Sequence, residues 1–121
     1  MNDQSIEKEI QEKGLTAPRV TPTDIEANIS CEFYFTGSQA VWSGIRESDQ
    51  TEVELNVIHT VLPLLTFCVL VLKNGFTVTG ESACASPENF DAELGRKIAR
   101  QNAVNKIWPL MGYELKERLS K

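Results

Sequence analysis

The sequence predicts an α+β fold: a small antiparallel sheet built around a β-hairpin and packed against one long helix, with short flanking helices. The first observation is the run "LTFCVLVLKNGFTVTGES", in which two β-prone segments flank Asn74-Gly75, the preferred pair for a two-residue hairpin turn. The second is the segment from about Asp91 to Trp108, whose apolar residues recur at helical spacing. With 121 residues, the chain is long enough for one domain with a modest core.

The N-terminal segment is expected to form a short helix over residues 1–14. Its apolar residues Ile6 and Ile10 are four positions apart, and Gly14 provides a stop. The segment "LTAPRVTP" then reads as a linker. We therefore divide the chain into an N-terminal helix and linker, residues 1–20, and a single α+β domain, residues 21–121.

A second short helix is predicted from Pro22 to about Ser30. Thr21 can cap it, Pro22 suits the first helical position, and Asp24 completes a capping box. The next segment, "FTGSQAVWSGIRESDQ", contains turn-forming residues and is interpreted as a partly ordered loop. "TEVELNVI" alternates apolar and polar residues with a period of two, which predicts a half-buried strand.

A two-residue turn at Asn74-Gly75 fixes the register of the hairpin, because Lys73 then faces Phe76. One sheet face is predicted to be core, and the other is semi-polar and suits a helix edge, a subunit contact or a ligand. The predicted core face carries Phe67, Val69, Val71, Phe76 and Val78, and the semi-polar face carries Cys68, Leu70, Leu72, Thr77 and Thr79.

The long helix presents a continuous arc of small and apolar residues. Gly95, Ala99 and Ala103 form a thin ridge that lets the helix lie close to the sheet, with Leu94 and Ile98 beside it. Asn102 falls inside this arc, so its polar side chain needs a hydrogen-bond partner. Trp108-Pro109 is expected to end the helix, and "YELKERL" to form a final short helix that carries Arg118.

Composition and charge narrow the functional classes. The net charge of −5 argues against binding to a nucleic-acid polymer. Residues 96–121 hold seven of the twelve Lys and Arg residues but only two of the seventeen acids, so this part carries +5 and residues 1–95 carry −10. The basic part is either a solvated helix face or a local site for a small anion.

Other classes find no support in the sequence. No apolar run approaches a membrane span, and the polar, acidic N-terminus does not resemble a signal peptide. The three cysteines have irregular spacing, which favours free thiols in a reducing cytoplasm. With a single histidine and no paired cysteines, neither a metal site nor a cofactor is expected.

The segment "GESACASPENF", between the hairpin and the long helix, is the main candidate for chemistry. Cys84 could act as a nucleophile only with His59 as its base, and a packed thiol is the simpler interpretation. Ser86 and Pro87 suit a helix start. Phe90 remains open, because an aromatic ring there either staples the helix to the core or stacks on a base.

A nucleotide pocket would need an aromatic ring, an arginine and a polar amide in one place. Arg118 is either solvated or forms a bidentate contact with a phosphate. The spacing of the sequence does not show whether Arg118 and the ring of Phe90 meet, within one chain or across a dimer interface.

Three motifs carry a family resemblance: "NGFTVTGESAC", "NFDAELGRKIA" and "NAVNKIWPLMGY", followed by a terminal "KERL". Together they span about residues 65–119. This run resembles a widespread family of small tailed-phage proteins, and it is similar to the Thoeris anti-defence sponge family. The longer segment before Leu64 departs from the compact members of that family.

The resemblance implies a binding protein and not an enzyme. Members of the sponge family sequester cyclic nucleotide immune signals, such as cyclic ADP-ribose isomers or cyclic di- and trinucleotides, in pockets shared between protomers. It implies a homo-oligomer, a dimer or a hexamer, in the cytoplasm of the infected bacterium. Carried over by residue, Phe90 would stack on a base and Arg118 would bind phosphate, with Asn102 and Ser82 as further ligand-binding candidates. The alternatives are an interaction module that inhibits a host protein, or a small enzyme that degrades the signal.

Overall fold

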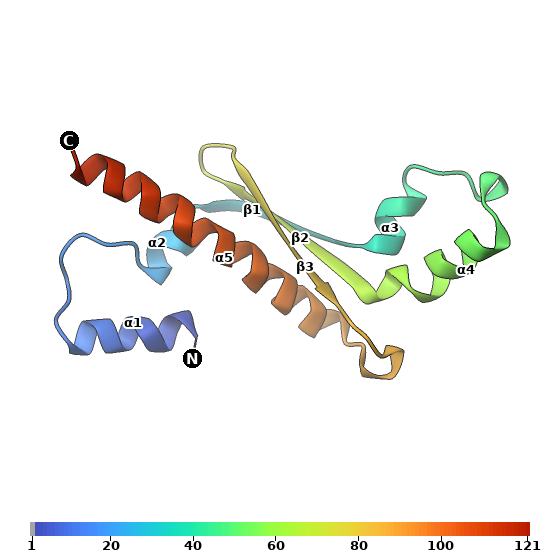
Figure 1. The fold of residues 1–121 in the computed structure, drawn as a ribbon, viewed down its shortest axis with the longest axis horizontal. Coiled ribbons are helices and arrows are strands. Elements are labelled where there is room, and N and C mark those ends of the chain that lie inside the picture. The colour runs from blue at the N-terminus through green and yellow to red at the C-terminus, as the bar shows by residue number, and fades with distance from the viewer. Residues whose placement is uncertain (1) are drawn as a thin grey trace.

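The computed structural model describes residues 2–121, which form an elongated α+β molecule (Figure 1). Its centre is a three-stranded antiparallel sheet in the order β1-β2-β3. The long helix α5 covers one face of this sheet, and two short helices, α3 and α4, extend from one end as an arm. The predicted fold class is therefore confirmed. The helices are α1 (Asp3–Glu12), α2 (Pro22–Ala27), α3 (Gly37–Trp42), α4 (Glu52–Thr60) and α5 (Ala92–Leu119), and the strands are β1 (Ile29–Thr36), β2 (Leu65–Leu72) and β3 (Thr77–Ala83).

The N-terminal helix α1 confirms the prediction for this segment; Met1 lies outside the described residues. Gly14 follows the helix with a positive φ of 67°, as expected of a glycine that ends a helix. A bidentate ion pair fixes α1 to the rest of the chain, with both Arg19 Nη atoms 2.6 Å from the Glu7 carboxylate oxygens. This contact lowers the pKa of Glu7 from 4.5 to about 2.

The helix α2 begins as predicted but ends early. Thr21 and Asp24 form the capping box, with Thr21 Oγ1 accepting from the Asp24 amide at 3.1 Å. The helix ends at Ala27, and the chain enters the strand β1 at Ile29. The prediction of a helix up to Ser30 was therefore wrong, and β1 was missed. Its β-prone residues Phe33 and Phe35 pair with Val69 and Phe67 of β2, so the strand gains partners that local spacing does not reveal.

The β-hairpin exists, but its register differs from the prediction by one residue. Val71 pairs with Thr77 and Leu70 with Val78, so the loop contains three residues, Lys73 to Gly75. Only Gly75 has a positive φ, of 89°, whereas the predicted two-residue turn also needs one at Asn74. Asn74 instead uses its side chain, whose Oδ1 accepts from the Phe76 amide at 2.9 Å.

The shifted register moves the residues of β3 relative to β2, so that Val78 shares a face with Leu70 instead of Val71. The face of β2 that was predicted to be semi-polar is the one that forms the core. The buried face carries Cys68, Leu70, Leu72 and Val78, under α5. Burial raises the pKa of the Cys68 thiol. The predicted core residues of β2 lie on the opposite face, where they are only half-buried, and Phe76 is 57% exposed.

The arm at the far end of the sheet corrects two further predictions. The segment predicted as a loop contains α3, and "TEVELNV", predicted as a strand, lies in α4. Capping boxes start both helices, at Thr36 with Gln39 and at Thr51 with Glu54. Ile58, which is 3% exposed, is the buried residue of α4. The period-two alternation of apolar and polar residues therefore led to a wrong prediction for this segment.

The helix α5 runs without interruption for 28 residues and contains Pro109, so the predicted break at Trp108-Pro109 was wrong. Gly95, Ala99 and Ala103 are buried against the sheet, which confirms the ridge of small residues. Leu94 and Ile98, placed in the same arc, are exposed instead. The helix can approach so closely because β3 carries Gly80 at the contact, next to the α5 backbone.

Candidate functional site

A pocket lined by several cations lies at the hairpin end of α5. It has a volume of about 770 Å³ between α5, α2 and the β2–β3 turn. Arg19, Lys73 and Arg118 bring three cations to its lining, and Asp24 and Glu114 bring two acids. Arg118 donates from Nε to Glu114 Oε1 at 2.6 Å and remains 66% exposed. The pocket can therefore accept a small anion through its lysine and arginine side chains.

The same pocket contains an aromatic ring and side-chain amides. Phe76 lines it from the start of β3, and Asn28 and Asn74 line it from α2 and the turn. These residues were not predicted as ligand contacts, because the hairpin register placed Phe76 in the core. An aromatic ring, an arginine and an amide thus meet here within one chain.

Phe90 lies at the other end of α5, directly before the helix. It is half-buried and contributes to a pocket of about 310 Å³ that also contains Arg96. Asp91 caps the helix next to it, with Oδ1 accepting from the Leu94 amide at 3.0 Å. The ring of Phe90 is thus partly packed and partly accessible, and its role in stacking stays a prediction.

Phe90 and Arg118 do not meet within one chain. The whole of α5, 28 residues long, lies between them, and at about 1.5 Å per residue this separates their backbones by about 40 Å. No cyclic dinucleotide or cyclic ADP-ribose could contact both residues of one chain.

The two weaker candidates lie near the middle of α5. Asn102 Nδ2 donates a 2.8 Å hydrogen bond to the backbone oxygen of Glu81 on β3. This satisfies the predicted need of the Asn102 amide for a partner and ties α5 to the edge of the sheet. Ser82 is half-buried on β3 and pairs with Thr66 of β2. Neither residue lines either of the two pockets around Phe90 and Arg118.

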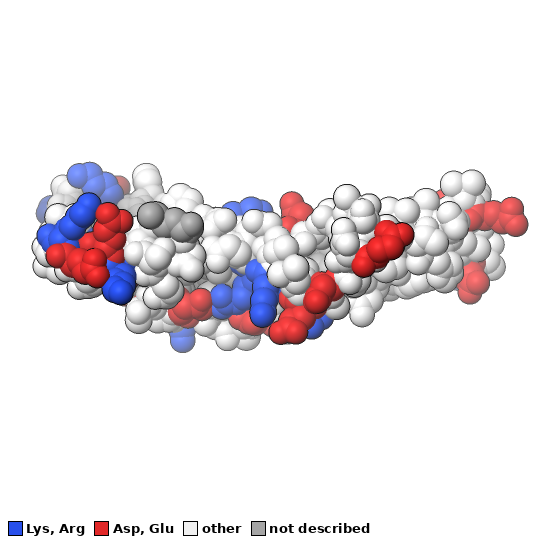
Figure 2. All heavy atoms as spheres, turned by 90° about the horizontal axis from the view of Figure 1, so that it is seen from below, with Lys and Arg blue, Asp and Glu red and all other residues white. Residues whose placement is uncertain are grey.

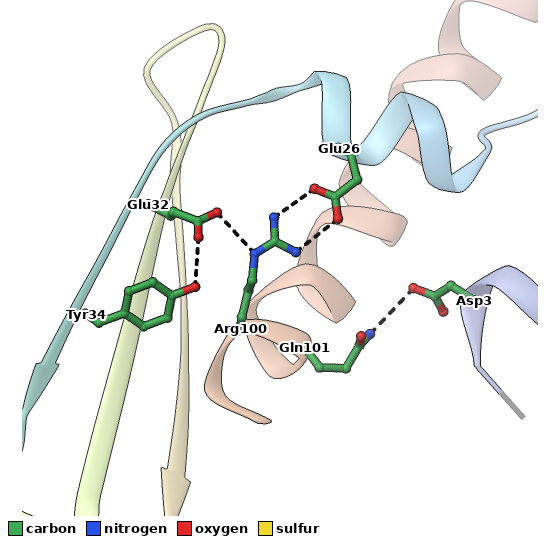
Figure 3. Close-up of polar contacts among 6 residues, drawn as sticks. All are labelled: Asp3, Glu26, Glu32, Tyr34, Arg100 and Gln101. Atoms are coloured by element: carbon green, nitrogen blue, oxygen red, sulfur yellow. Dashed lines mark hydrogen bonds and ion pairs between the residues drawn. The ribbon is translucent and has the colours of Figure 1, made fainter. Parts of the chain in front are cut away.

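A polar network that the sequence did not predict joins three elements through Arg100 of α5 (Figure 3). Arg100 donates two hydrogen bonds to Glu26 of α2, at 3.0 and 2.7 Å, and one to Glu32 of β1, at 3.1 Å. Tyr34 donates to the other oxygen of Glu32 at 3.0 Å. This network could not be predicted from the sequence, because β1 itself was not recognised.

The charges in this network change the protonation of its members. The hydrogen bonds from Arg100 lower the pKa of Glu26, and those to the carboxylates raise the pKa of Arg100. Burial, followed by the bond to Glu32, raises the pKa of Tyr34. Glu26 is therefore held as a carboxylate, Arg100 as a cation and Tyr34 as a neutral phenol, which suits a structural clamp between α5, α2 and β1.

The proposed Cys84 nucleophile has no base beside it. Its thiol donates to the Ser86 backbone oxygen at 3.1 Å, whereas the His59 ring lies against Trp42 in the arm, with the ring centres 5.8 Å apart. Within residues 2–121, no group of three or more His, Cys, Asp or Glu side chains is arranged to hold a metal ion. The packed-thiol interpretation of Cys84 fits this geometry.

Comparison with protein families gives one match. The model of the phage protein (N4 Gp49/phage Sf6 gene 66) family matches residues 20–119, which is most of the chain. The chain belongs to this family. No match was found among curated proteins or among solved structures.

The part of the chain that matches the N4 Gp49/Sf6 gene 66 family includes the whole sheet, the arm and α5. Phe90 and Arg118 both lie within it, whereas α1 precedes it. No helix in residues 2–121 of this family member combines the length and the apolar character needed to cross a membrane.

Proposed function

We propose that this phage protein binds cyclic nucleotide immune signals in the cytoplasm of the infected bacterium and sequesters them unchanged. Cyclic ADP-ribose isomers are the first candidates, followed by cyclic di- and trinucleotides. The family match supports a phage protein, and the resemblance of residues 65–119 to anti-defence sponges supports the ligand class. The basic pocket at Arg118, with its aromatic ring and amides, supports an anionic nucleotide.

The basic pocket around Arg118 carries the proposal, because it brings Arg118 and Lys73 together with the ring of Phe76 and two side-chain amides. Phe90 lies at the other end of α5, so a pocket that uses both Phe90 and Arg118 needs two chains. The helix α5 carries exposed apolar residues, with Leu94 53%, Ile98 44% and Leu110 41% exposed. These exposed side chains suit contact with a second copy of the chain.

Two copies of α5 that run antiparallel would bring the distant ends together. If the helices cross between Asn102 and Lys106, Phe90 of one copy lies at the level of Arg118 of the other. Each pair of chains would contain two equivalent pockets, as two-fold symmetry requires.

In each shared pocket the two residues have separate tasks. Arg118, helped by Lys73, would bind a phosphate through charge-assisted hydrogen bonds. The ring of Phe90 from the other copy would stack on a base, which is worth about 1–3 kcal/mol. Binding of this kind needs no bond to be made or broken, so the ligand would leave the pocket intact.

Isothermal titration against a panel of cyclic ADP-ribose isomers and cyclic oligonucleotides tests the ligand class. We expect micromolar or tighter binding of at least one compound, with one ligand per chain. Arg118→Ala and Phe90→Ala should each weaken binding, whereas Lys116→Ala, a neighbouring exposed cation outside the pocket, should not. The absence of binding across the whole panel would refute the proposal.

Mixing the two variants tests whether the pocket is shared. A mixed pair of Phe90→Ala and Arg118→Ala chains contains one pocket with both native side chains and one with neither. Mixing should therefore restore high-affinity binding to part of the sites. If Phe76 of the same chain provides the ring instead, mixing restores nothing, and Phe76→Ala abolishes the stacking contribution.

Two other functions make different predictions. A degrading enzyme would consume the signal, so recovery of the intact ligand after heat denaturation of the complex excludes it. The interaction module was based on the semi-polar sheet face and on the acidic N-terminal half of the chain; α5 buries Cys68, Leu70 and Leu72 of that face, which leaves the acidic half as its basis. A stoichiometric host protein recovered with the chain, together with no nucleotide binding, would favour that function.

A further inference from the structure

The outer face of the sheet, opposite α5, is largely apolar in its β1 and β2 columns. We define the outer face by the side chains of Cys31, Phe33 and Phe35 on β1, Phe67, Val69 and Val71 on β2, and Thr77, Thr79 and Glu81 on β3. Phe35 and Phe67 stack with ring centres 5.2 Å apart. The only charge on this face is Glu81, on the outermost strand β3.

No helix covers the outer face in the way that α5 covers the other. The helix α5 packs on β2 and β3 from the buried side, and α3 touches β1 and β2 at the end of the sheet. Phe33, in the middle of β1, is 57% exposed. Three aromatic rings and two valines on one open surface are typical of a contact site on a folded domain.

The charges at the two ends of the molecule indicate what this face contacts. The arm, residues 37–64, contains four acids, Glu47, Asp49, Glu52 and Glu54, and one arginine. The opposite end carries Lys73 at the hairpin turn and the basic end of α5. Figure 2 shows acidic side chains at the arm end on the right, and Lys and Arg side chains interspersed with Asp and Glu toward the middle and the left.

We infer that the outer face packs against the outer face of a second copy, with the two chains antiparallel. A face without charge in its β1 and β2 columns can pack on itself without burying like charges. Two sheets then form an aligned sandwich about 10 Å thick. A two-fold axis in the plane between the sheets can run along the chains or across them. The axis along the chains puts acidic arm beside acidic arm. The antiparallel arrangement puts each arm beside the basic hairpin end of the other copy, so charge selects it.

The size of the face leads to the same arrangement. An exposed apolar patch on a single domain measures about 300–600 Å², so two such faces bury about 600–1,200 Å² in total. This is at or below the lower limit of about 1,200 Å² for a stable interface. A stable pair therefore needs further contact area, and in the antiparallel arrangement the arms would supply it without placing acidic arm beside acidic arm.

This contact is separate from the proposed contact along α5, because the outer face and α5 lie on opposite sides of the sheet. Both contacts can exist in one assembly, and the present inference does not depend on a nucleotide. Its test uses no ligand, so its failure would leave the proposed function standing.

Cys31 provides a natural probe, since it is exposed on the outer face, whereas Cys68 is fully buried. In a Cys84→Ser background, a thiol-reactive maleimide should label Cys31 quickly in dilute protein and slowly in concentrated protein. Phe33→Glu should keep labelling fast at every concentration and raise the dissociation constant roughly a hundredfold, because it buries an unpaired carboxylate on each side. Thr79→Arg, on the same face, should also keep the labelling of Cys31 fast and raise the dissociation constant.

Leu15→Glu is the matched control, because Leu15 is 58% exposed but lies outside the sheet. It should leave the protection of Cys31 unchanged. Raising the salt from about 0.1 M to 1 M shortens the screening length from about 10 to 3 Å and should weaken the antiparallel pair. Labelling of Cys31 that is independent of protein concentration overturns the inference, as does protection that survives both Phe33→Glu and Thr79→Arg in folded protein. Stronger association at high salt overturns the antiparallel arrangement.

Discussion

The contact between α5 and β3 depends on Gly80, and replacing it with alanine tests how the fold is held together. A Cβ atom at Gly80 would overlap the backbone oxygen of Ala99 and the backbone nitrogen of Ala103, and would lie 2.9 Å from the carbonyl carbon of Asn102. All three obstacles are main-chain atoms of a regular helix, so no side-chain rotation can relieve them. The helix must move away from β3.

The cost can be worked out from the contacts that this movement disturbs. Overpacking of a close contact costs about 1–3 kcal/mol. Moving the helix also breaks the 2.8 Å hydrogen bond from Asn102 to Glu81, which is worth about 0.5–1.5 kcal/mol. We expect Gly80→Ala to lower the free energy of unfolding by about 2–4 kcal/mol, a large part of the stability of a small domain, about 5–15 kcal/mol.

Urea denaturation followed by far-UV circular dichroism measures this change. Gly112→Ala is the matched control, because it makes the same substitution in α5 with no heavy atom within 4 Å of the new Cβ. It should raise the free energy of unfolding by about 0.5–1 kcal/mol, since alanine is the better helix former. If Gly80→Ala costs less than about 1 kcal/mol, the close packing of α5 on β3 is not the main constraint and the reasoning fails.

Three further variants test other contacts. Arg100 lowers the pKa of Glu26 in the folded protein below its usual value of 4.5. The native protein therefore loses this contribution to its stability as the pH falls from about 4.5 through the folded pKa of Glu26. Arg100→Gln should remove this loss, so the free energy of unfolding from urea titrations should depend less on pH in the acid range. Glu7→Gln should release α1 and speed its amide exchange near neutral pH; in the native protein the same release occurs only toward the Glu7 pKa of about 2. Pro109→Ala should raise the free energy of unfolding by about 1–3 kcal/mol, because it restores a helical hydrogen bond.

The sequence predicted the elements with strong local signals. The capping box at Thr21, the stop at Gly14 and the ridge of Gly95, Ala99 and Ala103 each follow from neighbouring residues, and each is present. The long helix was also recognised, but Pro109 was given too much weight. Packing of Ile107 and Met111 against the core holds the helix together on both sides of the proline.

The errors arose where distant contacts decide the structure. β1 follows a capped helix and becomes a strand because β2 offers it a partner. The hairpin was predicted one residue out of register, since Asn74-Gly75 also fits a three-residue loop that needs a positive φ only at the glycine. That step placed Val78 on the same face as Val71, and the apolar run of β2 did not show which of its two faces α5 covers, so Phe76 was missed as a pocket residue. Phe33 was missed as a surface residue because β1 was not recognised.

The small residues that bring α5 close to β3 also explain why one chain leaves its candidate site incomplete. A continuous helix of 28 residues, buried against the core from Gly95 to Ile107, is a rigid spacer, so Phe90 and Arg118 cannot approach each other by bending. The same packing covers only one face of the sheet, and Phe33 remains exposed on the other. The proposed shared pocket would place a second chain along α5, and the inferred sandwich would place a second chain across the sheet. Since these surfaces lie on opposite sides of the sheet, an assembly that uses both would complete the pockets and cover the apolar face together. Phe90→Ala should then reduce nucleotide binding without changing the protection of Cys31. Phe33→Glu should remove the protection of Cys31 without changing nucleotide binding.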